Sequence, residues 1–273
     1  MKSFRCFAGI LFTGVVLLST SLAQQASDKT QSTTVSASDP HAVLLASEAQ
    51  LALTGGTSVS DVTMAADSLW IAGGTKASGT ASLKAKGTGQ GLVQISAGAV
   101  NRKEIRNDIN GPDGRWEGSD GAAHPVAPHN CWGPAAWFSP HAVVQMMSDP
   151  KMALRYFGQE TRNGIAVDHI QMHRPSSAKN QQVAGDLEKL STVEILLDSA
   201  SHLPVAITFN THPDDDYSRD IPNEVRFSDY RSVSGVMVPF HIQRWLQGML
   251  NTDLTVTTAT VNNGLTDSDF TLQ

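Results

Sequence analysis

The chain has 273 residues and a formal net charge of −6 at pH 7. Its lysines and arginines are scattered singly, which argues against nucleic acid or an anionic membrane surface as a partner, since both need a basic groove or stripe. The length suits one large all-β domain, because such domains routinely reach roughly 200–250 residues.

The N-terminus has the pattern of an export signal. Lys2 and Arg5 precede an apolar run over residues 7–18, and the small residues that follow place a cleavage site after Ala23. The run is shorter than the roughly 20 residues that cross a bilayer, and no other segment approaches that length. We therefore expect residues 1–23 to be a signal peptide, no integral membrane span, and a periplasmic or secreted mature protein. Cys6 leaves with the leader, so Cys131 has no partner for an intrachain disulfide.

Residues 24–38 are rich in Ser and Thr and have no apolar period, which predicts a flexible segment. A single folded domain is expected over residues 39–273. It begins with a helix, because Ser38 or Asp39 can cap the N-terminus, Pro40 suits the first position, and Gly55-Gly56 ends the apolar pattern.

Beyond this helix the apolar period changes to two, which is typical of strands. Strands are expected at 59–71, 77–86, 91–97 and 102–109, with a short one around Trp116. The pattern breaks from Asp120 to Pro140. A helix is then expected over 141–147, strands near Leu154 and Val167, and a polar helix over 181–189. Alternating strands follow at 192–198, 205–210, 224–230, 236–246 and 254–261.

Each alternating segment has one apolar and one polar face. In the segment 205–210, for example, Val205, Ile207 and Phe209 share one face. This pattern suits an antiparallel sheet that covers a core on one side. No internal repeat and no composition shift marks a second domain, so the predicted fold class is mostly β (α+β).

Three stretches near the C-terminus resemble a known superfamily. The run 198–204 has an aspartate, a turn and Leu203-Pro204, and the run 227–239 has Tyr230, a turn at Gly235, apolar residues and Pro239. The ending 261–270 is similar to a last strand. With the leader, the N-terminal helix and the long meander, these stretches resemble the LolA/LolB-like periplasmic lipoprotein-carrier superfamily, to which outer-membrane lipoprotein-sorting proteins belong.

The resemblance implies a curved antiparallel sheet that forms an incomplete β-barrel, a half-barrel wrapped around a few helices. It also implies an apolar cavity that holds lipid or the acyl chains of a lipoprotein. The chain departs from the superfamily between Asp120 and Pro140, where it is longer and more aromatic than expected.

Large apolar side chains are the candidates for lining such a cavity or its lid. They are Trp70, Trp116, Trp132, Trp137, Phe138, Met146, Met147 and Trp245. The segment from Trp132 to Phe138 must pack somewhere or meet a partner, so it is either a plug at one end of the sheet or a movable lid. The two methionines suit ordinary core packing or an adaptable ligand surface.

Imidazoles and a thiol near the interruption raise a catalytic or zinc hypothesis. His124, His129, Cys131 and His141 match no zinc spacing, and no nucleophile elbow is present. His169 and His173 share one strand face without further ligands, and Asp214-Asp215-Asp216 lacks the pattern of a calcium loop. We therefore predict no catalytic residue, no metal and no cofactor.

Two main hypotheses for function follow. The first is an exported, non-enzymatic carrier or receptor that binds lipid or an acylated lipoprotein in its cavity. The alternative is a structural or protein-binding module of the cell envelope with a self-filled cavity, which contacts a protein partner through the Trp132–Phe138 segment. A hydrolase or metalloenzyme is a third class, kept because His129 and Cys131 are close in sequence.

Overall fold

The computed structural model describes residues 38–272. The predicted signal peptide and all of the Ser/Thr-rich segment except Ser38 lie outside these residues, so both stay predictions. Within the described range, no helix is long and apolar enough to cross a membrane.

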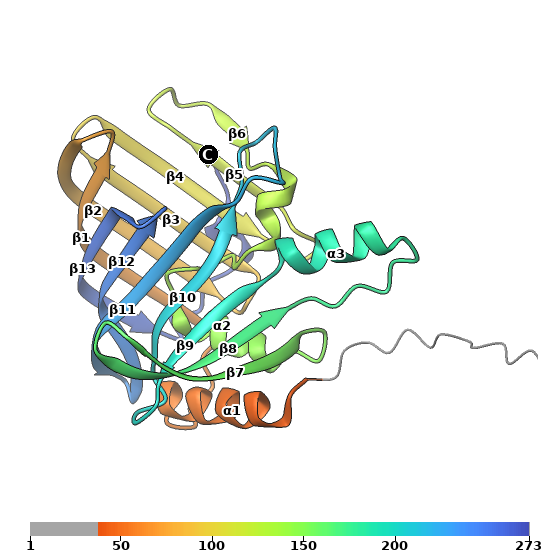
Figure 1. The fold of residues 1–273 in the computed structure, drawn as a ribbon. Helices are drawn as coiled ribbons and strands as arrows, with labels where there is room; N and C mark the ends of the chain where they lie inside the picture. The colour runs from red at the N-terminus through yellow and green to blue at the C-terminus, as the bar shows by residue number, and fades with distance from the viewer. Residues whose placement is uncertain (1–37, 273) are drawn as a thin grey trace, which may run out of the picture. The chain divides into compact units, whose positions relative to one another are not determined.

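The strands of this range form one 13-stranded antiparallel sheet in the order β6-β5-β4-β3-β2-β1-β13-β12-β11-β10-β9-β8-β7. The strands are β1 (Asp61–Ala72), β2 (Thr75–Lys86), β3 (Gln90–Ala97), β4 (Val100–Asn107), β5 (Gly114–Glu117), β6 (Ala123–Pro125), β7 (Ala153–Arg162), β8 (Ile165–His173), β9 (Val193–Asp198), β10 (Pro204–Thr211), β11 (Ile221–Val233), β12 (Val236–Leu246) and β13 (Met249–Val261). The sheet curves without closing, and β6 and β7 are its two edges (Figure 1). The predicted mostly β fold with an incomplete barrel is confirmed.

Three α-helices and two 3₁₀ helices complete the fold of the described range. They are α1 (Pro40–Thr54), α2 (Pro140–Met147), α3 (Gln181–Leu190), η1 (Pro128–Trp132) and η2 (Asp267–Phe270). Helix α2 lies within the curve of the sheet and α1 lies along one end of it (Figure 1).

The first helix follows from its capping residues. The Asp39 carboxylate accepts a hydrogen bond of 2.8 Å from the His41 backbone, and Pro40 occupies the first helical position. Gly55 ends the helix in the left-handed conformation, φ 57°, and its N–H donates to the Leu51 carbonyl. Glycine adopts this conformation without a steric penalty.

The core lies on the concave side of the sheet, where strand residues meet the buried faces of α1 and α2. Leu53 of α1, Val144 of α2, and the strand residues Leu83, Ile195 and Ile242 are all fully buried there. A smaller cluster lies on the opposite face, where Leu92 and Ile105 pack against Phe270 of η2. Strand β3 therefore carries core residues on both faces, with Ile95 on the concave side and Leu92 on the other.

The strand predicted over 254–261 ends at Val261 as expected. The stretch 261–270, which resembled a last strand, instead turns at Asn262 with φ 57° and leads to η2, whose capping box is formed by Thr266 and Asp269. The Lys84 ammonium binds the Asp269 carboxylate at 2.7 Å. The 120–140 segment contains β6 and η1, which its broken periodicity did not reveal.

Candidate ligand-binding site

A cavity of about 280 Å³ lies on the concave side, between the sheet and the segment that precedes α2. Three of the predicted tryptophans line it: Trp70 from β1, Trp116 from β5, and Trp137. A pocket of about 30 Å³ shares Trp70 and Trp137 with it and adds Val93, Ile95 and Thr252 to the walls. The aromatic part of this site was expected from the sequence.

The cavity also carries charged groups, which differs from the expectation of an apolar cavity. Strand β4 contributes Arg102, Glu104 and Arg106, and β12 contributes Arg244. Residues two apart on a strand point to the same face, so the spacing 102, 104, 106 puts all three side chains on the cavity side while Ile105 packs on the other face. The alternation Arg-x-Glu-x-Arg in a predicted strand was the signal that could have revealed this set.

Arg102 is held by an ion pair and by an aromatic ring. Its Nη2 donates to Glu104 Oε2 at 2.9 Å, and its guanidinium carbon lies 4.4 Å from the centre of the Trp116 ring. The His124 ring also stacks on Trp116, and the centroids of the two rings are 4.3 Å apart. Trp116 is therefore positioned by both groups, and its ring orientation on the cavity wall is fixed.

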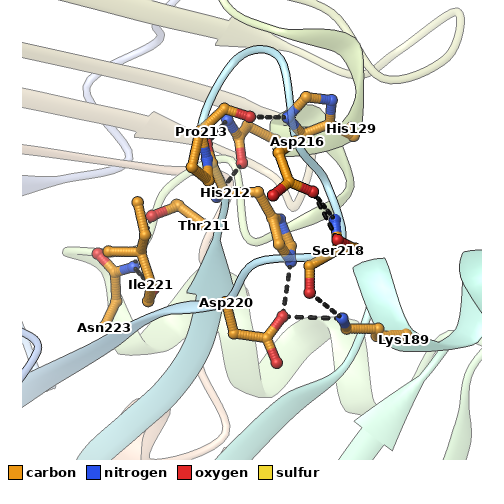
Figure 2. Close-up of polar contacts among 11 residues, drawn as sticks. His129, Lys189, Thr211, His212, Pro213, Asp216, Ser218, Asp220, Ile221 and Asn223 are labelled. Carbon is orange, nitrogen blue, oxygen red and sulfur yellow. Dashed lines mark hydrogen bonds and ion pairs between the residues drawn. The ribbon is translucent and has the colours of Figure 1, made fainter.

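Arg244 is positioned by Asn223 and Trp137. Its Nε and Nη2 both donate to Asn223 Oδ1, at 3.0 and 2.7 Å, and its guanidinium carbon lies 4.8 Å from the Trp137 ring centre. Asn223 is itself fixed, because its amide donates to Thr211 Oγ1 and to the Ile221 carbonyl, both at 2.9 Å (Figure 2). Burial lowers the pKa of Arg244, yet guanidinium groups stay protonated in proteins.

Arg106 has no comparable partners. The residue is 8% exposed, and its Nε and Nη2 have no hydrogen-bond partner. The aliphatic part of the Arg106 side chain packs against Gly114 of β5, the strand next to β4. A Cβ atom at position 114 would lie only 2.8 Å from Arg106 Cδ. Any side chain at position 114 would therefore displace the arginine.

The segment before α2 is fastened to the β10–β11 connection. The Asn130 amide donates to the His212 carbonyl and its oxygen accepts from the His212 backbone N–H, both at 2.8 Å. The His129 ring donates to the Pro213 carbonyl at 3.0 Å (Figure 2). These contacts place η1 beside the mouth of the cavity, which Asn130 and Asp214 help to line.

The His212 side chain extends this fastening toward α3. It is buried and lies 3.1 Å from the Asp220 carboxylate, which also binds the Lys189 ammonium at 2.9 Å (Figure 2). Burial lowers the pKa of His212, and the hydrogen bond to Asp220 offsets part of that shift. The group thus joins η1, the β10–β11 connection and α3 in one polar network.

Replacing Asn130 with alanine is expected to destabilise the protein by about 2 kcal/mol, because two hydrogen bonds to backbone are lost and a buried carbonyl is left unpaired. Hydrogen exchange should then speed up in η1 while β12 and β13 stay protected. Asn101→Ala, at an exposed position on β4, is the control. Unchanged exchange in η1 would show that Asn130 does not fasten the segment.

The remaining predicted residues lie in other places. Trp132 and Met146 line a second, more open cavity of about 550 Å³, together with Asp108, whose pKa is raised by burial to about 6. Phe138 and Met147 are buried in the main core. Trp245 lines neither cavity, and the Arg226 guanidinium carbon lies 4.3 Å from the centre of its ring. A ligand-binding role for any of the eight stays a prediction.

The residues of the catalytic hypothesis have separate surroundings. Cys131 is buried, and burial raises the pKa of its thiol, which disfavours the nucleophilic thiolate. His129 binds the Pro213 carbonyl, His124 stacks on Trp116, and His141 is buried in α2. Within residues 38–272, no three His, Cys, Asp or Glu side chains are grouped so that they could hold a metal ion.

Comparisons with known proteins place the fold. No protein-family model and no curated protein matches the sequence. Solved structures do match. One is an outer membrane lipoprotein-sorting protein domain from Vibrio parahaemolyticus, with a TM-score of 0.55 and 14% sequence identity. The match covers 84% of this chain and 96% of that domain, so the two share a fold.

Two further structures agree with this assignment. A DUF1329 family protein from Desulfovibrio piger has a TM-score of 0.55 and 13% identity, covering 85% of this chain and 98% of that one. A LolA superfamily protein from Nitrosomonas europaea has a TM-score of 0.52 and 11% identity, covering 84% and 97%. The resemblance to LolA-type proteins drawn from the C-terminal turns is confirmed at the level of fold.

Proposed function

We propose that the protein is an exported, non-enzymatic carrier or receptor that holds lipid, or the acyl part of a lipoprotein, against the concave face of its sheet. The observation that carries this proposal is the tryptophan-lined cavity between the open sheet and the segment before α2. Aromatic and aliphatic walls with a few fixed polar groups are typical of sites for small amphiphilic ligands.

The fold supports the same proposal. The lipoprotein-sorting protein domain from Vibrio parahaemolyticus has this fold along nearly its whole length. The leader pattern at residues 1–23 fits the periplasm or another exported location. Burial raises the pKa of the Cys131 thiol, which disfavours the nucleophilic thiolate. The Ser228 hydroxyl contacts His241, which also binds Asp253, but none of the three lines the tryptophan-lined cavity.

The second candidate is the cell-envelope module that binds a protein and no lipid. The packed interior favours it, because α1, α2, Trp137 and Phe138 fill much of the concave side. In this structure Trp137 and Phe138 are buried. They do not present a contact surface, so a protein partner would have to bind elsewhere on the molecule.

Native mass spectrometry of the protein purified without detergent from the envelope of its host, followed by organic extraction, separates the two candidates. The carrier is expected to retain a stoichiometric acylated molecule that organic solvent releases. A protein that has the mass of the polypeptide alone and takes up no lipid from vesicles would reject the carrier and favour the module.

A further inference from the structure

The cavity has a cationic side that the proposed apolar cargo does not explain. Three guanidinium groups, of Arg102, Arg106 and Arg244, line it against the two carboxylates of Glu104 and Asp214. Glu104 is already paired with Arg102 at 2.9 Å, and Asp214 is exposed in the β10–β11 connection. The Asp108 carboxylate interacts with Arg106 through its charge but forms no hydrogen bond with it and does not line the cavity. Positive charge therefore remains on the lining of the cavity.

Arg106 is the group that most needs a ligand. A buried polar group without a partner is unfavourable, and a buried charge more so. Arg106 is 8% exposed, lines the cavity, and has two guanidinium nitrogens without a partner. Arg102 and Arg244, by contrast, already have their own anchors in Glu104 and Asn223, so each is held in place while donors remain available.

We infer that Arg102, Arg106 and Arg244 form a binding site for the anionic group, phosphate or carboxylate, of an amphiphile. The planar guanidinium matches the two oxygens of such groups with parallel hydrogen bonds. Trp70, Trp116 and Trp137 line the same cavity and would contact the adjoining apolar part. This inference rests on the proposed function, because the amphiphile is the cargo itself: an acidic lipid or an acylated molecule with an acidic group.

The size of the cavity agrees with a head group. Its volume of about 280 Å³ lies just below the range of about 300–1,000 Å³ for pockets that enclose small molecules. We therefore place the acidic group and the first part of the chains in this cavity. The remaining chain length would extend beyond it.

The test compares two soluble probes that differ in the phosphate alone: dihexanoyl phosphatidic acid and dihexanoylglycerol. Binding to the exported form is measured by calorimetry and by tryptophan fluorescence, with inorganic phosphate as a third probe. Phosphatidic acid is expected to bind at least about tenfold more tightly than dihexanoylglycerol, the effect of one charge-assisted contact. Arg106→Gln is expected to remove that preference.

The control is Arg115→Gln, at an exposed position on the adjacent strand β5, which should keep the preference. If Arg106→Gln does not fold, judged by its thermal midpoint, Arg102→Gln provides the same comparison.

Equal affinity for both amphiphiles in every variant would overturn the inference and leave the lipid carrier standing. Tight binding of phosphate with no uptake of either amphiphile would support an anion site and reject the lipid cargo. Binding of none of the probes would overturn both.

Discussion

Replacing Phe138 with alanine is expected to destabilise the protein by about 3–5 kcal/mol, the usual cost of removing a buried aromatic ring from a packed core. Phe138 is 0% exposed in the main core, and its ring lies edge to face with Trp137, centroids 5.7 Å apart. Urea unfolding followed by circular dichroism measures the loss in the free energy of unfolding.

The same measurement separates a plug from a lid. Phe157→Ala is the control, since Phe157 is 47% exposed on β7 and packs only partly; its loss should stay below about 1 kcal/mol. A similarly small loss for Phe138→Ala would mean that the Trp132–Phe138 segment leaves the core easily, as a lid does. A large loss would mean that a ligand has to enter beside this segment and not beneath it.

The protein is expected to lose about 3 kcal/mol of stability through His141 between pH 6.5 and pH 4. His141 is 5% exposed on α2, and burial lowers its pKa from 6.5 to about 4. Because the unfolded chain binds the proton more readily, the contribution is complete above pH 6.5 and is lost as the pH falls through about 4. Denaturant unfolding across this range measures the slope.

His141→Leu should remove this part of the pH dependence. Neither ring nitrogen of His141 is within hydrogen-bond geometry of a partner. The nearby Met237 backbone raises the pKa slightly and so offsets a small part of the lowering by burial. Because no hydrogen bond is lost, leucine should be tolerated at this position at pH 7. Val144→Ala, a fully buried and non-titrating position on the same helix, should lower stability by the same amount at every pH. An unchanged slope in His141→Leu would show that the imidazole reaches water when it is protonated.

The elements themselves were largely predictable from the sequence. Alternation of apolar residues, as at Ile207 and Phe209, which both reach the main core, reports strands because side chains on a strand alternate between two faces. Val205 was expected on the same face, but the register shift between Pro204 and Ala206 turns it to the opposite cluster. The first helix was predictable from Asp39, Pro40 and Gly55, which act within a few residues of themselves. The family resemblance in the C-terminal turns then led to the correct fold.

The sequence also singled out the tryptophans, yet it did not show that only Trp70, Trp116 and Trp137 lie together. The arginines went unnoticed because Arg102 and Arg106 appear as scattered charges in the chain. Arg244, far from them in sequence, comes to the same cavity only when β12 and β4 curve around one core.

Local structure could therefore be predicted from patterns between neighbouring residues, and the half-barrel fold from those patterns together with the resemblance of the C-terminal turns. The tertiary structure decided which face of each strand is concave, where the 120–140 segment packs, and that Arg106 is buried without a partner. The physical reason is that a cavity is made by residues from distant strands. Their meeting depends on register and curvature, and a shift of one residue would turn each strand's side chains to the opposite face.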